Sequence, residues 1–271
     1  MTTALSPQHP TARAFLVRAN NPSPMTLEGT NTWVLVEPGG NEAIVVDPGP
    51  DNASHRDAVM AAVEAAGAKQ VALIVLTHGH ADHCEGAPAL SQVAAAPVRA
   101  IAPMHCSQGH QPLSDGEQLR IGGLRLDVIA TPGHTADSAC FVVGNDAALL
   151  TGDTILGRGS TVVARPDGGL ADYLATLRRL RALVNERQLL VVLPGHGPVV
   201  DDPAAKVHAY LQHREQRLQQ VRAAAITSDT VDEVLQVVYG DVSPELLFAA
   251  RWSLLAQLDY LRDEGVSVPA E

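Results

Sequence analysis

The stretch Thr77-His78-Gly79-His80-Ala81-Asp82-His83 follows directly on the apolar run from Val71 to Leu76. Three histidines and a carboxylate within six residues cannot all point into a core. On a turn that leaves a strand, alternation sends His78 and His80 the same way, whereas Asp82 and His83 enter from the following turn. The loop can therefore offer two groups of ligands, and we predict that it serves two neighbouring metal ions.

Three further candidates share this setting, because each follows the end of an apolar run and has glycine or proline beside it. They are His134 in Thr-Pro-Gly-His-Thr, Asp153 in Thr-Gly-Asp and His196 in Pro-Gly-His-Gly. A rigid scaffold commonly positions its chemistry on such loops. One isolated histidine at a strand end is more often structural, but the seven-residue motif reverses that expectation. We predict one metal centre that contains His78, His80, Asp82, His83, His134, Asp153 and His196.

Other residues near these loops form weaker patterns. Asp47 in Val-Val-Asp-Pro-Gly also ends an apolar run. It is either an ordinary turn aspartate or an acceptor that orients a ligand histidine through its second ring nitrogen. The group His105, Cys106 and His110 has ligand chemistry but neither a strand-end setting nor a known zinc spacing, so we expect a surface loop there. Cys84 could bind metal, but the other ligands leave no need for it.

Short apolar runs rich in β-branched residues alternate with helical patterns up to residue 202. The runs at 32–36, 43–46, 71–76, 124–129, 140–143, 147–150 and 189–193 are typical of strands. Helical patterns occupy 57–66 and 172–187. Because many of the runs are almost continuously apolar, we expect sheets that are covered on both faces, with helices packed outside them. The pattern therefore predicts an α/β fold.

The character of the chain changes after Asp202, where no further strand run appears. Residues 203–225, 232–239 and 244–265 are expected to form three helices. The sequence thus predicts a catalytic domain at 1–202 and a small all-helical domain at 203–271. Three helices in this order resemble a winged-helix module whose wing is reduced or missing. A helical cap over the active site is the simpler interpretation, because the segment has no basic excess.

Composition limits the classes of function. The 271 residues carry a formal net charge of −11, which repels polyanions at long range and favours a small-molecule substrate. The three cysteines are scattered and odd in number, so they are expected to be reduced. The first ten residues lack an export signal, and no apolar stretch approaches the roughly 20 residues that span a bilayer. We therefore expect a cytoplasmic protein without a membrane partner.

With its three downstream partners, the His-x-His-x-Asp-His motif resembles the metallo-β-lactamase superfamily over roughly residues 14 to 200. The resemblance implies a four-layer αβ/βα sandwich. It also implies that His78, His80 and His134 hold one zinc ion, that Asp82, His83 and His196 hold the other, and that Asp153 bridges them. Manganese or iron in place of zinc stays open. A bridging carboxylate resembles hydrolytic relatives such as lactonases and thioesterases more than true β-lactamases.

A closer resemblance is to the branch named for β-lactamase-like protein 2. It rests on the segment Asn21 to Thr32, the Leu156-Gly157-Arg158-Gly159 loop and His213-Arg214-Glu215. Members of that branch include a single-stranded endoribonuclease and thioesterases that release acyl chains from carrier proteins. Through this resemblance alone, Asn31 and Arg158 become candidate substrate contacts, although each could equally be a hydrogen-bonding loop residue.

The expected mechanism is hydrolysis by a hydroxide held between the two ions, with Asp82 and Asp153 as the catalytic carboxylates. Net charge favours an ester, thioester or lactone, as a small molecule or a carrier-bound acyl group. The alternative is a single-stranded endoribonuclease, for which Arg158, Arg165, Arg214 and Arg217 would have to converge on the cleft. A β-lactamase and a winged-helix sensor are minor alternatives. The sequence leaves open whether the helical tail forms a homodimer.

Overall fold

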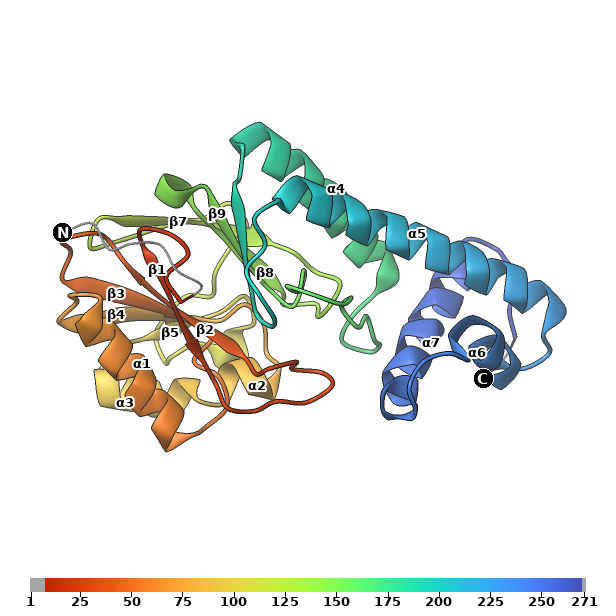
Figure 1. The fold of residues 1–271 in the computed structure, drawn as a ribbon, viewed down its shortest axis with the longest axis horizontal. Coiled ribbons are helices and arrows are strands. Elements are labelled where there is room, and N and C mark those ends of the chain that lie inside the picture. Colours follow the sequence, from red (N-terminus) through yellow and green to blue (C-terminus); the bar gives the residue numbers. More distant parts are fainter. Residues whose placement is uncertain (1–7, 270–271) are drawn as a thin grey trace.

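The computed structural model describes residues 8–269, so the outer ends of the two predicted domains, residues 1–7 and 270–271, lie outside the described residues. Two five-stranded sheets are stacked against each other, and a long helix leads from them to a separate group of helices (Figure 1). The metal-ligand candidates follow the ends of strands in both sheets.

The first sheet has the order β1-β2-β3-β4-β5. Its strands are β1 (Ala14–Arg18), β2 (Asn31–Val36), β3 (Glu42–Val46), β4 (Gln70–Val75) and β5 (Val98–Arg99). Strands β3 and β4 are parallel and pair Val46 with Val75 at their carboxyl ends. Because parallel strands end at the same edge, Asp47 leaves the sheet beside the loop that begins at Thr77.

The second sheet has the order β10-β9-β8-β7-β6. Its strands are β6 (Gln118–Ile121), β7 (Leu124–Ala130), β8 (Ala139–Val143), β9 (Ala148–Gly152) and β10 (Val191–Pro194). The parallel pair β9 and β10 ends with Gly152 opposite Pro194, so the loops that carry Asp153 and His196 leave side by side. A backbone hydrogen bond of 2.7 Å from Ala139 to the Thr77 carbonyl joins this sheet to the histidine-rich loop of the first.

Side chains from both sheets meet in a closed core, and helices cover the outer faces. Trp33 and Leu35 of β2 pack in the same cluster as Phe141 of β8 and Leu150 of β9. Outside the first sheet lie α1 (Ala53–Ala65) and α3 (Ala87–Ala94), and outside the second lie α4 (Leu170–Arg187) and the first half of α5 (Pro203–Thr227). The order helix, sheet, sheet, helix confirms the predicted α/β sandwich. Burial on both faces of each sheet explains why the strand runs are so apolar.

Helix α5 connects the sandwich to the C-terminal helices. Its early residues Val207 and Leu211 pack with α4, whereas Val221 belongs to a second cluster with residues of α6 (Val231–Tyr239) and α7 (Leu247–Asp263). Figure 1 shows α5 running past the edge of the sheets to α6 and α7. Among the described residues from 203 onwards there is no strand, and hence no wing.

Several boundaries differ from the sequence predictions. Helix α1 begins at Ala53 rather than at residue 57, because the Asn52 side chain caps it by accepting from the His55 backbone. The last predicted helix divides into the short helix η3 (Pro244–Leu246) and α7. Strands β1, β5 and β6 and helix α3 were not predicted. Their runs are short or interrupted by polar residues, and the strands among them form through pairing within the sheets.

Short helices complete the fold. They are α2 (Ala81–Cys84), η1 (Pro103–His105) and η2 (Gly144–Asp146). No helix among residues 8–269 is long and apolar enough to cross a membrane.

Replacement of Phe141 tests the packing between the two sheets. Its side chain is fully buried in the central cluster, so Phe141→Ala is expected to lower the free energy of unfolding by about 3–5 kcal/mol. Urea denaturation followed by circular dichroism measures the change. Val93→Ala, at an exposed position of α3, is the control and should change stability by less than about 0.5 kcal/mol. Equal stabilities for the two variants would contradict this description of the core.

Candidate metal centre

The seven predicted ligands come together at one edge of the sandwich. His78 and His80 follow β4, Asp82 and His83 lie on α2, and His134 lies in the turn between β7 and β8. Asp153 and His196 follow β9 and β10. The structure therefore brings together side chains from four loops.

Two glycines permit this close approach. Gly152 has a φ of +48°, and a Cβ atom there would lie 2.4 Å from Oγ1 of Thr77. A Cβ atom on Gly195 would lie 2.6 Å from Oδ1 of Asp153. Both distances are far below van der Waals contact, so any larger residue would push the ligand loops apart.

The first group of ligand atoms consists of three histidine nitrogens. Nδ1 of His80 lies 3.0 Å from Nε2 of His78 and 3.1 Å from Nε2 of His134. Ligand atoms around a tetrahedral zinc ion are about 3.3 Å apart, given Zn–N distances of about 2.0–2.1 Å. The three nitrogens thus have the spacing that one metal ion requires.

The second group consists of two histidines and a carboxylate. Nε2 of His196 lies 3.2 Å from Nε2 of His83 and 3.1 Å from Oδ2 of Asp82, and the remaining distance, from His83 to Asp82, is 3.4 Å. These three atoms form a second triangle with metal-ligand spacing.

Asp153 lies between the two groups. Its Oδ1 is 3.4 Å from Nε2 of His83, and its Oδ2 is 3.4 Å from Nε2 of His196 and 3.8 Å from Nε2 of His134. Oδ1 is buried and has no hydrogen-bond partner among the described residues. A buried carboxylate oxygen without a partner is costly, and cations on either side would satisfy it. The donor set therefore fits two divalent ions.

In four of the five histidines, Nδ1 forms a hydrogen bond with a neighbouring polar group and Nε2 points into the centre. His134 donates to the Val162 carbonyl at 2.7 Å, and His196 contacts the Gly29 carbonyl at 3.2 Å. A carbonyl oxygen can only accept, so each ring has a proton on Nδ1 and directs Nε2, the atom that can bind a cation, into the centre. His80 is reversed, with Nε2 3.5 Å from Asp167.

Asp47 is in contact with both groups. Its Oδ2 lies 2.9 Å from Nδ1 of His83 and accepts a 2.7 Å hydrogen bond from the Thr77 hydroxyl. That hydroxyl is in turn 2.9 Å from Nδ1 of His78. Oδ1 of Asp47 accepts from the Thr77 backbone at 2.7 Å. One buried carboxylate therefore orients His83 directly and His78 through Thr77. The geometry supports the orienting role over that of an ordinary turn aspartate.

The pKa values of the ligands follow their surroundings. Burial lowers the pKa of His78 and of His134, so both rings are neutral. Burial also opposes a charge on His83 and His196, but the neighbouring carboxylates outweigh it and raise the pKa of His83 well above its ordinary value. The pKa of His196 rises to about 9 for the same reason. The second group is thus a place of negative potential that attracts cations.

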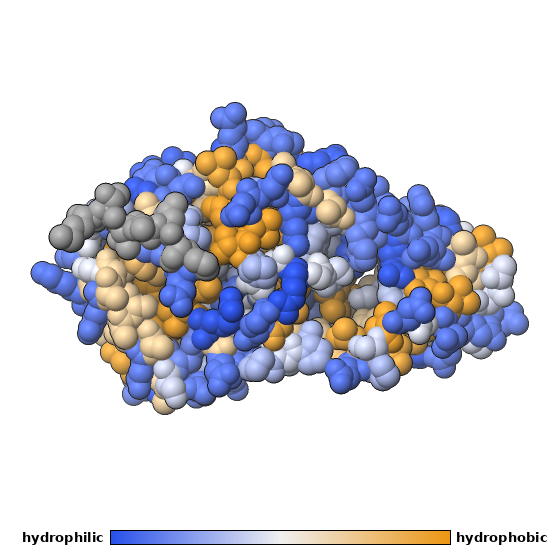
Figure 2. All heavy atoms as spheres, in the orientation of Figure 1, coloured by the Kyte–Doolittle hydropathy of each residue, from blue (hydrophilic) through white to orange (hydrophobic). Residues whose placement is uncertain are grey.

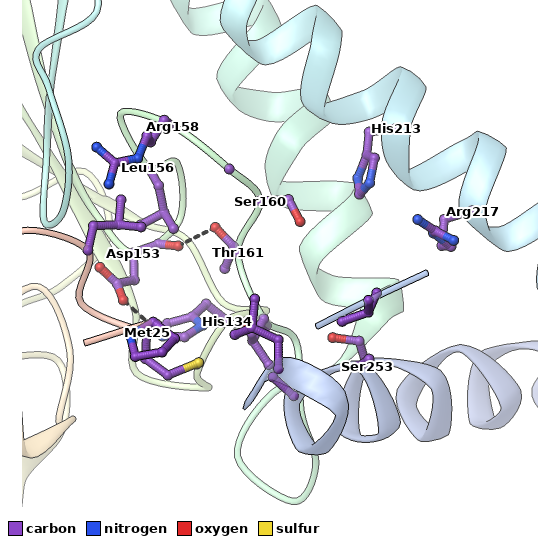
Figure 3. A pocket seen from close by; sticks show the side chains of 18 of the residues that line it. Met25, His134, Asp153, Leu156, Arg158, Ser160, Thr161, His213, Arg217 and Ser253 are labelled. Atoms are coloured by element: carbon purple, nitrogen blue, oxygen red, sulfur yellow. Dashed lines mark hydrogen bonds and ion pairs between the residues drawn. The ribbon is translucent and has the colours of Figure 1, made fainter. Parts of the chain in front are cut away.

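Two adjoining pockets open from the centre. One is bordered by His80, Asp82 and His196 together with Trp252 of α7. The other, of about 330 Å³, extends from His134 and Asp153 between the sandwich and the C-terminal helices. Figure 2 shows a hollow in this region with apolar residues beside it, and Figure 3 shows the lining residues of the second pocket. The sequence did not predict Trp252, because its approach depends on how α7 folds back.

The two candidate substrate contacts have different environments. Asn31 is buried, and its amide nitrogen donates to the carbonyls of Pro194 and Gly197 at 3.0 and 2.9 Å. Its carbonyl oxygen accepts from Arg18. Asn31 therefore supports the loop that carries His196 and does not face either pocket. Arg158 lines the second pocket and forms an ion pair with Glu28.

The other basic residues considered for RNA binding also lie near the pockets, but most are already engaged. Arg165 forms an ion pair with Asp259, and Arg214 is buried with its guanidinium donating to the Thr161 carbonyl. Arg217 donates to the Val238 carbonyl. All four arginines therefore line the two pockets, as the endoribonuclease alternative requires, but Arg158 and Arg165 are paired with carboxylates.

The group at His105, Cys106 and His110 stays outside the centre. His105 ends η1, and a Cβ atom on Gly79 would lie 2.5 Å from its Nε2, so His105 packs against the back of the histidine-rich loop. Within residues 8–269, no cluster with metal-ligand spacing includes any of the three residues.

Comparisons with known proteins identify the family of the chain. The model of a family described as "Metallo-beta-lactamase superfamily" matches residues 25–196. The chain is 33% identical to the lactamase-like protein vrtG of Penicillium aethiopicum, over 94% of this chain and 81% of that protein. It is 33% identical to an atrochrysone carboxyl ACP thioesterase of Aspergillus chevalieri, over 88% and 77%. The beta-lactamase-like protein 2 homolog of Caenorhabditis elegans is 30% identical, over 92% and 84%.

A solved structure shares the fold of most of the chain. The crystal structure of a metallo-beta-lactamase family protein from Thermus thermophilus has a TM-score of 0.76 at 24% identity and covers 93% of this chain and 94% of its own. Because it covers nearly the whole chain, the C-terminal helices belong to the shared architecture.

Replacement of Asp47 tests its orienting role. Asp47 has a φ of +52°, a conformation that asparagine also tolerates, so Asp47→Asn removes the charge with little backbone strain. We expect metal affinity to fall about 10–100-fold, because His78 and His83 lose their common acceptor. Competition with a chelator measures the affinity, and thermal unfolding checks the fold.

Asp51→Asn is the matched control, since Asp51 is exposed and pairs with Arg56 and not with a ligand. Unchanged metal affinity in a folded Asp47→Asn protein would rule out the role.

Proposed function

Because the chain belongs to the metallo-β-lactamase superfamily, we propose that this metal-dependent hydrolase uses two divalent ions, zinc in the first place, to cleave acyl thioesters carried on a protein or a small thiol. Water adds to the carbonyl carbon, the carbon–sulfur bond breaks, and the products are a carboxylic acid and a thiol. The observation that carries the proposal is a mainly apolar pocket that opens directly from His134 and Asp153.

The residues of the centre have distinct parts in this proposal. His78, His80 and His134 would hold one ion, Asp82, His83 and His196 the other, and Asp153 would touch both. When bound, the two ions would supply a nucleophilic hydroxide from water and stabilise the negative charge that develops on the carbonyl oxygen.

The chain's own side chains do the remaining work. Asp82 and Asp153 both border the pocket that contains Trp252, and their pKa values are held below the ordinary range, because the neighbouring histidines outweigh the effect of burial. Both are therefore ionised and can accept a proton from water. Asp47 and the carbonyls of Val162 and Gly29 fix the ring orientations.

Two observations support a thioester substrate. The pocket between the sandwich and the helices is lined by Leu156, Val162, Leu246, Ala249 and Ala250, which suits the carbon chain of an acyl group. In addition, relatives of 32% and 33% identity are named atrochrysone carboxyl ACP thioesterase. A carrier-bound acyl group is consistent with both.

The endoribonuclease alternative has less support. The net charge of −11 opposes a polyanion at long range, and two of the four arginines that this function requires, Arg158 and Arg165, are paired with carboxylates. The winged-helix sensor would need a DNA-reading surface, and the C-terminal helices have no basic excess and no wing among the described residues.

Metal removal tests the dinuclear scheme. We expect about two divalent ions per fully active chain by elemental analysis. Complete chelation should abolish hydrolysis, and added zinc should restore it. Full activity with fewer than two ions, or activity that survives complete metal removal, would refute the scheme.

A side-by-side assay tests the substrate class. The zinc-loaded protein is given acyl thioesters, a lactone, a β-lactam and short single-stranded RNA at equal concentrations. We expect kcat/KM to be highest for the thioesters, and Asp82→Ala to lower it by about 100-fold or more, since one metal ligand and one carboxylate are lost. Faster cleavage of RNA than of every thioester would overturn the proposal in favour of the endoribonuclease.

A further inference from the structure

The second pocket has an unusual charge for so acidic a chain. Its lining contains three arginines, Arg158, Arg214 and Arg217, and one carboxylate, Asp153. Glu28 neutralises Arg158, and Asp153 belongs to the metal centre. Among the described residues, Arg214 and Arg217 have no carboxylate partner. Their two positive charges are therefore left uncompensated in the wall of the pocket.

Both arginines are held in place by neutral groups. The guanidinium of Arg214 lies over the ring of Tyr173, 4.9 Å from its centroid, and donates to the Thr161 carbonyl. The guanidinium of Arg217 lies 4.5 Å from the centroid of the Tyr239 ring and donates to the Val238 carbonyl. Stacking and one carbonyl fix each side chain without neutralising it.

Unpartnered nitrogens occur in the same wall. Arg214 is 6% exposed, and its Nε has no hydrogen-bond partner among the described residues. Nδ1 of His213 is likewise buried and without a partner there. Buried polar atoms are nearly always paired, so these two nitrogens leave hydrogen-bonding capacity unused directly behind the pocket wall.

These groups lie apart from the metal ligands. Figure 3 shows His213 and Arg217 reaching from α5 toward Ser253 of α7, on the side of the pocket away from Asp153 and His134. Burial and the charges of Arg214 and Arg217 lower the pKa of His213, which agrees with a positive potential at this end. Between the two ends the lining is mainly apolar.

We infer that the pocket binds an acyl group whose far end has an anionic oxygen group, such as a carboxylate, held by Arg217 with His213 and Arg214. This inference rests on the proposed thioesterase function and specifies which acyl groups the enzyme prefers. An apolar segment would lie against Leu156 and Val162, with the scissile carbonyl near Asp153. The lining between the metal centre and Arg217 is mainly apolar, which suits the carbon chain of an acyl group, so we place the anion at the end of that chain. The phosphate of a coenzyme A leaving group has similar chemistry and is the alternative that the test must distinguish.

The test compares two acyl groups of equal length on a thiol that has no phosphate. Glutaryl and valeryl thioesters of N-acetylcysteamine both have five acyl carbons, but only glutaryl has a remote carboxylate. We expect the wild-type holoenzyme to prefer glutaryl. Arg217→Gln should lower kcat/KM for glutaryl about 10–100-fold and leave valeryl within about twofold, because only one substrate loses a charge-assisted hydrogen bond.

Matched variants separate this effect from a loss of structure. Arg222→Gln removes an exposed arginine of the same helix that pairs with Glu264 and does not line the pocket, so it should leave both rates unchanged. His213→Leu should reduce the glutaryl preference, and His213→Asn, which keeps a polar group near Nδ1, should restore part of it.

A binding measurement distinguishes failure of this inference from failure of the proposed function. Isothermal titration of the holoenzyme with glutarate and valerate should show tighter binding of glutarate, and Arg217→Gln should remove the difference. If no thioester is hydrolysed but the difference in binding holds, the proposed reaction is wrong and the anion site stands.

Three results would overturn the inference. They are equal effects of Arg217→Gln on glutaryl and valeryl substrates, no effect on either, and, when valeryl coenzyme A is added as a third substrate, a loss of kcat/KM on that substrate as large as the loss on glutaryl.

Discussion

Burial of charge at the edge where the two sheets meet is the constraint on which this structure depends. His83 is fully buried, and the buried Oδ1 of Asp153 has no hydrogen-bond partner among the described residues. Carboxylates in such a place are stable only beside positive charge. The neutral rings of His78 and His134 direct nitrogen lone pairs into the same place, and these lone pairs also favour a bound cation. The centre is therefore built to bind metal, and the same carboxylates raise the pKa of His83 and His196.

Two features of the sandwich bring the metal-ligand candidates together: strands that end at a common edge, and close contacts between the loops that follow them. Parallel pairing of β3 with β4 and of β9 with β10 delivers ligand loops to a common edge. Glycine at positions 152 and 195 then lets loops from the two sheets approach without a clash. Asp47 joins the two ligand groups, since it contacts His83 and, through Thr77, His78. A substitution of Asp47 is therefore expected to alter the orientation of ligands in both groups.

The C-terminal helices turn an exposed metal edge into a pocket. Helix α5 packs on α4 with its first half and with α6 and α7 through its second half, so the position of α7 relative to the centre is fixed by continuous packing. Trp252 and Ala249 reach the pockets from α7, and Arg214 and Arg217 reach the second pocket from α5. The lining of the pockets accordingly comes from both the sandwich and the C-terminal helices, whereas the metal-ligand candidates all come from the sandwich.

The sequence by itself determined the fold class, the helical nature of the tail and the seven ligand candidates. These features are local: ligands are grouped in one short motif or follow apolar runs with glycine and proline, and strand and helix periods can be read along the chain. The exact role of Asp47, the supporting role of Asn31 and the lining of the pocket were decided by tertiary structure. Each depends on residues far apart in sequence, such as Asn31 with Pro194 or Asp153 with Arg217, and no local pattern records which loops meet.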